Sequence, residues 1–298
     1  MKHVRFAPLA SIVALALAAA GCVINVDADS VVVKEEKQFS VGEGAELTLT
    51  TFDGSIEVRS WDKAQVSVEI RKRGPDRETA AALEVKSTQE GSHVRIEAPS
   101  PKVTREVFGI GNVSSPSVSF VVHVPEHLKL DATTKDGSIT VANVNGAVTL
   151  RSGDGSIQGE GITGNLNART EDGSMRIVRA NGSVVAESGD GSIRIDGKVE
   201  SLRARTDDGS IDVDAAEGTA MKEDWEVSTG DGSITLRVPK GFTADVDGES
   251  RDGGVESNMD GVESHDDNGR GTLRGKIGSG GHVLKLRSGD GSIRLLNR

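Results

Sequence analysis

The spacing of Asp-Gly pairs constrains this chain more than any other feature of its sequence. Five pairs follow one another at intervals of 18 residues, and nearly all continue Ser-Ile; they begin at Asp136, Asp154, Asp172, Asp190 and Asp208. Further copies, at looser spacing, begin at Asp53, Asp231, Asp252 and Asp290, as expected where insertions enter loops. A constant period of this kind predicts a solenoid, in which each unit buries its apolar face only by stacking on the next.

Apolar and polar residues alternate within each unit. Val148 and Leu150 precede Asp154 on one parity, Arg151 has the opposite parity, and Ile157 follows three residues after the Asp. The alternation predicts short strands with one buried face, and the change of parity requires one residue to be absorbed at a corner. We expect the Gly of each pair to supply a positive φ and the Asp side chain to accept from the following backbone N–H groups. A second corner is predicted at Gly146, Gly164, Gly182 and Gly218.

These patterns predict an all-β fold, a single-chain β-solenoid similar to a parallel β-helix, with 18-residue coils and irregular N-terminal coils or a cap. Asp-Gly is also a strong hairpin signal, so a hairpin meander is the alternative, although a meander requires no constant period. Aromatic residues make up only 3% of the chain, which suits a narrow interior filled by aliphatic side chains. A column of hydroxyls is expected to face inward near the corner: Thr134, Ser152, Thr170, Ser188, Thr206 and Thr229.

The beginning of the chain has the character of an export signal. Lys2 and Arg5 precede an apolar stretch that ends at Cys22, the only cysteine of the chain. We therefore expect a lipoprotein-type signal peptide at 1–21, with lipidation of Cys22 as the membrane anchor in the cell envelope. Val23 is not the Asp that signals inner-membrane retention, so the outer membrane is expected if the cell is Gram-negative, with the domain facing the periplasm or the surface. Beyond the leader we predict a lipid-anchored tether at 22–40, an irregular β part of the solenoid at 41–130, and regular repeats at 131–298.

Several short motifs together resemble one bacterial family. They are Asp53-Gly54-Ser55-Ile56 followed by Trp61-Asp62, the pairs Val124-Pro125 and Val238-Pro239, the serial Gly-Asp-Gly-Ser-Ile units, and the final Ser288-Gly289-Asp290-Gly291-Ser292-Ile293. On these motifs the chain resembles the bacterial putative-adhesin family, a domain of unknown function built of β-solenoid coils. The resemblance covers most of the mature chain and implies a solenoid fold and a surface location, but no known reaction. The rigid 18-residue period and the invariable corner Asp depart from the family's pattern.

The recurring corner Asp is the sharpest candidate site. Stacked coils would place Asp136, Asp154, Asp172, Asp190 and Asp208 about 4.8 Å apart, where like charges repel by about 1 kcal/mol in water. One hypothesis is that the column binds a divalent cation such as Ca²⁺, which prefers carboxylate and carbonyl oxygens. The other is that each Asp caps its own turn and is partly neutralised by the column of Arg151, Arg169, Arg205 and Arg287. The second needs no ligand, and the repeat lacks the Gly-Gly-x-Gly-x-Asp spacing of calcium-binding solenoids, so we predict no cofactor and keep Ca²⁺ as the alternative.

Charge and motifs argue against two large classes of function. The formal net charge of −11 disfavours nucleic acid as a partner. Each notable carboxylate recurs from coil to coil and no Gly-x-Ser-x-Gly motif occurs, so we expect no catalysis. We expect a rigid acidic solenoid that presents equivalent outward residues to an envelope protein or a polysaccharide, for adhesion, scaffolding or envelope-stress-related binding. The alternatives are a divalent-cation-binding structural module and a carbohydrate-active β-helix enzyme.

Overall fold

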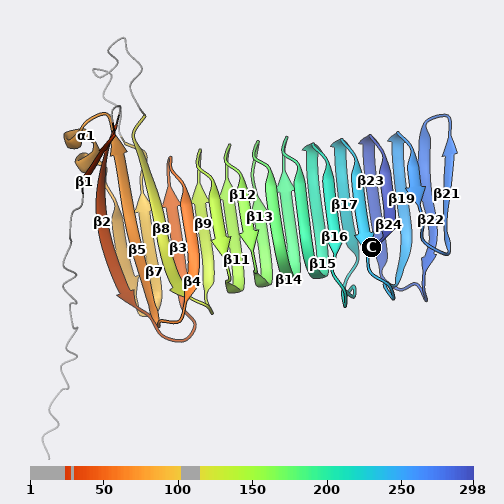
Figure 1. The fold of residues 1–298 in the computed structure, drawn as a ribbon, viewed down its shortest axis with the longest axis horizontal. Coiled ribbons are helices and arrows are strands. Elements are labelled where there is room, and N and C mark those ends of the chain that lie inside the picture. Colours follow the sequence, from red (N-terminus) through yellow and green to blue (C-terminus); the bar gives the residue numbers. More distant parts are fainter. Residues whose placement is uncertain (1–23, 28–29, 102–114) are drawn as a thin grey trace, which may run out of the picture.

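The computed structural model describes residues 24–27, 30–101 and 115–298, and the predicted signal peptide and Cys22 lie outside these ranges. The molecule is elongated, and its strands stack side by side along one axis (Figure 1). One coil consists of a strand, the Asp-Gly corner, a second strand and a return corner, so two sheets enclose the interior. We name the sheet of strands before the Asp-Gly corner the first sheet, and the sheet of strands after it the second sheet.

Most strands belong to one of the two sheets. The first sheet contains β3 (Glu46–Thr51), β7 (His93–Ala98), β9 (Lys129–Thr134), β11 (Asn145–Ser152), β13 (Thr163–Arg169), β17 (Trp225–Asp231), β19 (Ala244–Asp252), β22 (Arg270–Ile277) and β23 (Val283–Asp290). The second sheet contains β4 (Ile56–Trp61), β8 (Ser117–Pro125), β10 (Ile139–Ala142), β12 (Ile157–Glu160), β16 (Ile211–Ala215), β18 (Ile234–Val238), β20 (Val255–Ser257) and β24 (Ile293–Asn297). Two long strands cross the return corner and contribute to both sheets, β14 (Met175–Ser188) and β15 (Ile193–Asp208).

Neighbouring coils of the regular part pair in parallel and in register. Ile139 lies opposite Ile157, and Ile157 lies opposite Met175, so each residue pairs with the one 18 positions later. Parallel pairing confirms the predicted solenoid and excludes the hairpin meander, in which successive strands would be antiparallel.

The order of the coils in space departs from their order in the chain at both ends. β3 pairs with both β7 and β9, so a later coil lies outside the first one. At the other end β23 pairs with both β17 and β19, and β24 pairs with both β18 and β20. The last coil of the chain is therefore inserted between two earlier coils, as Figure 1 shows for β23.

Antiparallel strands close both ends of the stack. At the N-terminal end, β1 (Ile24–Asp27), β2 (Ser30–Ser40) and β5 (Gln65–Gly74) extend the second sheet beyond β8, and β6 (Lys86–Glu90) pairs with β7. The short helix α1 (Arg77–Ala82) follows β5, and its N-cap Asp76 accepts a hydrogen bond from the N–H of Thr79 at 2.7 Å. At the C-terminal end the outer strand is β21 (Val262–Asp267), whose exposed charged residues disfavour pairing with another edge.

Residues 30–40 are not the tether that we expected at 22–40. They form β2, which pairs over ten residues with β5. The many charged residues of this segment did not indicate a strand in the sequence. One of them, Glu35, forms an ion pair at 2.6 Å with Lys72, a lysine that is only 6% exposed. Phe39 packs against the core from the same strand.

Aliphatic side chains fill the space between the sheets. Along β11 the buried Val148 and Leu150 alternate with Thr149 and Arg151, whose side chains lie on the outer surface. Each buried aliphatic side chain contributes about 1.5–3 kcal/mol relative to an exposed one, so the continuous interior is the main source of stability. Trp225 is fully buried and packs on Phe242 with ring centroids 5.5 Å apart. In the described part of the chain, no helix is both long and apolar enough to cross a bilayer.

Candidate functional site: corner ladders and outer grooves

A ladder of buried hydroxyls runs along the inside of the Asp-Gly corner. Thr170 is 2% exposed, donates to the carbonyl oxygen of Gly155 in the adjacent coil at 3.0 Å, and accepts from the N–H of Gly173 in its own coil at 3.2 Å. The hydroxyl thus bridges the backbones of two coils. The same donation to an adjacent corner carbonyl recurs at Thr51, Thr134, Ser152, Ser188, Thr206, Thr229, Ser250 and Ser288. The predicted inward column is confirmed, and it continues into the terminal coils.

Close approach of neighbouring coils explains the Gly of each Asp-Gly pair. A Cβ on Gly155 would lie 2.1 Å from the carbonyl oxygen of Gly137, far inside van der Waals contact. The same close contact recurs from coil to coil along the whole stack. In their order along the axis, the glycines concerned are Gly54, Gly137, Gly155, Gly173, Gly191, Gly209, Gly232, Gly291 and Gly253. Positive φ, the reason that we expected, is found at Gly54, Gly232 and Gly291 but not at the five regular corners from Gly137 to Gly209.

The five corner Asp side chains are exposed and form one column along the edge of the stack: Asp136, Asp154, Asp172, Asp190 and Asp208. The expectation that they cap their turns is wrong, because the Ser or Thr two residues earlier accepts the hydrogen bond from the corner Gly N–H in the four coils from Thr134 to Ser188. Burial, and then the neighbouring Asp136 carboxylate, raise the pKa of Asp53. Within the described ranges no group of three or more His, Cys, Asp or Glu residues could hold a metal ion. Calcium binding stays a hypothesis, which requires that millimolar Ca²⁺ raise the melting temperature.

The Arg column does not pair with the corner Asp residues, contrary to expectation. Each Arg lies on the outer surface of the first sheet, and its carboxylate partner lies on the same surface or at its rim. The ion pairs are Arg151–Asp131, Arg169–Glu187, Arg205–Asp207 and Arg287–Asp247, with N–O distances of 3.1, 3.3, 3.1 and 2.7 Å. The column therefore belongs to the surface of the sheet, not to the corner.

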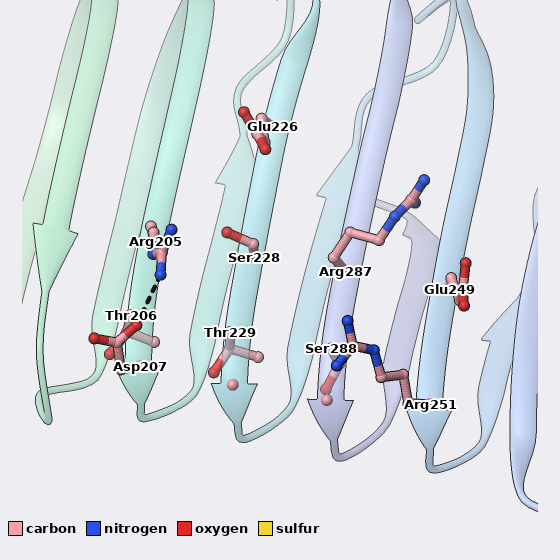
Figure 2. Close-up of a pocket in the computed structure, with 12 residues that line it drawn as sticks. Arg205, Thr206, Asp207, Glu226, Ser228, Thr229, Glu249, Arg251, Arg287 and Ser288 are labelled. Carbon is pink, nitrogen blue, oxygen red and sulfur yellow. Dashed lines mark hydrogen bonds and ion pairs between the residues drawn. The ribbon is translucent and has the colours of Figure 1, made fainter.

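Two neighbouring grooves lie on this outer surface. The first, of about 410 Å³, is lined by β15, β17, β23 and β19 through Arg205, Thr206, Asp207, Glu226, Ser228, Thr229, Gly230, Glu249, Arg251, Arg287, Ser288 and Gly289 (Figure 2). The second, of about 510 Å³, is lined by Arg169, Thr170, Glu171, Asp172, Glu187, Ser188, Gly189, Arg203, Arg205 and Asp207. Because Arg205 and Asp207 line both, the grooves form one band along the axis of the solenoid.

Glycines open these grooves. The residue before the corner Asp alternates between small and charged in four successive coils, as Gly153, Glu171, Gly189 and Asp207. A Cβ on Gly189 would lie 2.5 Å from the carbonyl oxygen of Glu171, since that oxygen accepts from the N–H groups of both Gly189 and Asp190 at 2.7 and 3.0 Å. We did not predict the grooves from the sequence, although this alternation was the available signal.

Guanidinium, hydroxyl and carboxylate groups alternate across the first groove. Figure 2 shows Ser228 between Arg205 on one side and Arg287 on the other. The hydrogen bond from Arg287 holds the pKa of Asp247 below its ordinary value, against the opposing effect of partial burial. The groove therefore offers both donors and acceptors, and it suits a polar ligand rich in hydroxyl or charged groups.

Comparison with known proteins identifies the family of the chain. It matches the family model described as Toastrack DUF4097 over residues 45–296, and it matches no curated protein. Similar solved structures include a putative adhesin from Bacteroides fragilis, at 13% identity and a TM-score of 0.40 over 89% of this chain and 97% of that one. Another is a putative lipid binding protein from Parabacteroides distasonis, at 16% identity and a TM-score of 0.44 over 89% and 96%. Since the family model covers most of its length, the chain belongs to the Toastrack DUF4097 family.

Proposed function

We propose that this chain is a non-catalytic binding protein of the cell envelope, which holds an extended polar polymer along the outer surface of the first sheet. The observation that carries the proposal is the pair of grooves that share Arg205 and Asp207 and follow the solenoid axis. A polymer lying along this axis would meet several coils at once, so individually weak contacts would combine through high effective concentration.

The groove lining favours a polysaccharide as the polymer. Arg205, Arg287 and Ser228 supply donors, while Glu226 and Glu249 supply acceptors. Sugar hydroxyls can use both kinds of group, and a sugar carboxylate can pair with a guanidinium. An apolar ligand would gain little in a groove built of these residues.

The placement in the envelope rests on the leader sequence and on Cys22. Replacing this residue, Cys22→Ser, should move the protein from the membrane fraction to the soluble fraction when lysed membranes are washed at high salt, which screens electrostatic contacts with headgroups. An unchanged distribution would argue against lipidation as the anchor.

In-cell photocrosslinking tests the binding face. One crosslinker replaces Ser228 in the groove, and two matched ones replace Gln158 and Arg194, which are exposed on the outer surface of the second sheet. We expect polysaccharide to be captured at Ser228 and not at the other two positions. A single recurrent protein at Ser228 would assign a scaffolding role instead, and equal capture at all three positions, or none, would contradict a groove-specific site.

A further inference from the structure

A third pocket lies at the N-terminal end of the stack and differs in charge from both grooves. It has about 340 Å³ and lies on the outer surface of the sheet formed by β2, β5 and β8. The antiparallel register places Arg73 opposite Ser117 and Arg71 opposite Ser119. Because alternate residues of a strand share one face, these four side chains lie on the same surface.

The pocket is lined by basic and hydroxyl residues together with Gly54 and Val32. Its lining in the described structure includes Arg71, Arg73, Ser55, Ser117 and Ser119 and no carboxylate, although the chain as a whole carries a formal charge of −11. Both grooves of the first sheet, by contrast, are lined by several acidic residues.

The donors of this pocket are only partly used. Arg71 donates through Nε to Glu69, which leaves its other guanidinium N–H groups, and Arg73 makes no ion pair with the described residues. Lys34, opposite Arg71, also pairs with Glu69, at 3.3 Å, so Arg71 shares this carboxylate with a second cation. The Oγ of Ser119 accepts from the N–H of Ser55 at 3.1 Å, which leaves its own O–H to donate elsewhere.

We propose that this pocket binds a phosphate group, held by the guanidinium groups of Arg71 and Arg73 and by the surrounding serine hydroxyls. Guanidinium groups pair with phosphate through short charge-assisted hydrogen bonds, and hydroxyl donors complete the shell of an oxyanion. A phospholipid headgroup and free inorganic phosphate share this chemistry.

The position of this pocket near the start of the mature chain favours a phospholipid headgroup over free phosphate as its ligand. Ile24, two residues after Cys22, pairs with Val33, which is adjacent to the pocket residue Val32. A lipid on Cys22, as the proposed function requires, would bring phospholipid headgroups to this end of the solenoid. Phosphate contacts here would then fix the orientation of the stack on the membrane. The solenoid axis, and the grooves that follow it, would extend away from the membrane surface.

The test uses residues 22–298 with Cys22→Ser, which keeps every described strand but carries no lipid. The pocket variant is Arg71→Gln with Arg73→Gln, and the control is Arg176→Gln with Arg194→Gln. The control removes the same charge from exposed positions of the second sheet that form no ion pair with the described residues. Binding is measured by co-sedimentation with vesicles of phosphatidylglycerol and phosphatidylcholine, by the melting temperature with inorganic phosphate, and by circular dichroism to verify folding.

We expect the parent and the control to bind the anionic vesicles, and the pocket variant to bind them about 10- to 30-fold more weakly, since each basic residue near an anionic surface strengthens binding severalfold. A phosphate-dependent rise in melting temperature without vesicle binding would support the site and assign it to soluble phosphate. Equal binding by the folded pocket variant and the control would overturn the proposal. Crosslinking at Ser228 is independent of this pocket, so failure of the groove hypothesis and failure of the phosphate site are distinguishable.

Discussion

Replacing Thr170 by valine would test whether the hydroxyl ladder holds the coils together. Valine has nearly the same shape as threonine, so the substitution Thr170→Val removes a hydroxyl and leaves little cavity. In the structure this hydroxyl shares its one proton between the carbonyl oxygens of Gly155 at 3.0 Å and Gly153 at 2.8 Å, and it accepts from Gly173 N–H at 3.2 Å. The carbonyl of Gly153 keeps its bonds from the N–H groups of Glu171 and Asp172 in the next coil, but the carbonyl of Gly155 and the N–H of Gly173 lose this partner.

The size of the effect follows from these two groups. Each buried polar group left without a partner costs about 1–3 kcal/mol, and the added methyl group returns less than about 1 kcal/mol. We therefore expect Thr170→Val to lower the free energy of unfolding by about 3 kcal/mol. In a chain of this size the melting temperature would fall by about 6–12 °C.

Urea and thermal unfolding followed by circular dichroism measure this loss, and hydrogen exchange at the amide of Gly173 reports it locally. The control is Thr170→Ser, which keeps the hydroxyl and should retain most of the stability and the protection of this amide. If Thr170→Val unfolds within about 0.5 kcal/mol of the parent, or if the serine variant falls as far, the hydroxyl is not what joins the coils.

Three further substitutions test other features of the coils. Gly155→Ala places a Cβ 2.1 Å from a carbonyl oxygen and should destabilise by more than about 3 kcal/mol in urea unfolding, whereas Gly42→Ala, whose Cβ would be 3.4 Å from its nearest neighbour, should stay within about 0.5 kcal/mol. Arg179 has a φ of 53°, so Arg179→Gly should stabilise by about 0.5–1 kcal/mol; a lower melting temperature would show that its exposed pair with Glu160 matters more than backbone strain. The pKa of Asp247 is lower in the folded state than its unfolded value of about 3.9, so its contribution is complete above that pH and is lost as the pH falls through the folded pKa. Asp247→Asn should accordingly reduce the loss of melting temperature between pH 5 and pH 3, and an unchanged acid dependence would refute this assignment.

The repeat predicted the coil but not the order of the coils. The 18-residue spacing correctly pairs Ile139 with Ile157 and Val148 with Leu166. It could not predict that β23 lies between β17 and β19, because every coil presents the same glycine and hydroxyl ladder to its neighbour. Since any coil can stack on any other through these ladders, the connecting loops and the caps must select the neighbours.

The candidate site was only partly predictable for a related reason. Alternation showed that Thr170 faces inward, but it did not decide whether Thr170 or Asp172 would bond the corner N–H of Gly173. Both residue types commonly accept hydrogen bonds in turns, so the choice depends on which side chain lies inside the corner. The grooves depend in turn on Gly189 lying outward between charged neighbours, which requires the observed geometry of the corner.

Inward and outward columns of the first sheet are under different constraints. The inward column that contains Thr170 admits only Ser and Thr, because each member must reach a carbonyl of the adjacent coil. One outward column, by contrast, contains a different residue type in each of seven successive coils: Thr149, Asn167, Val185, Arg203, Glu226, Lys285 and Asp247. Stacking therefore requires no particular side chain on the outer surface. Substitutions there, such as those at Ser228, should change stability by no more than about 0.5 kcal/mol, so a loss of binding can be attributed to the surface itself.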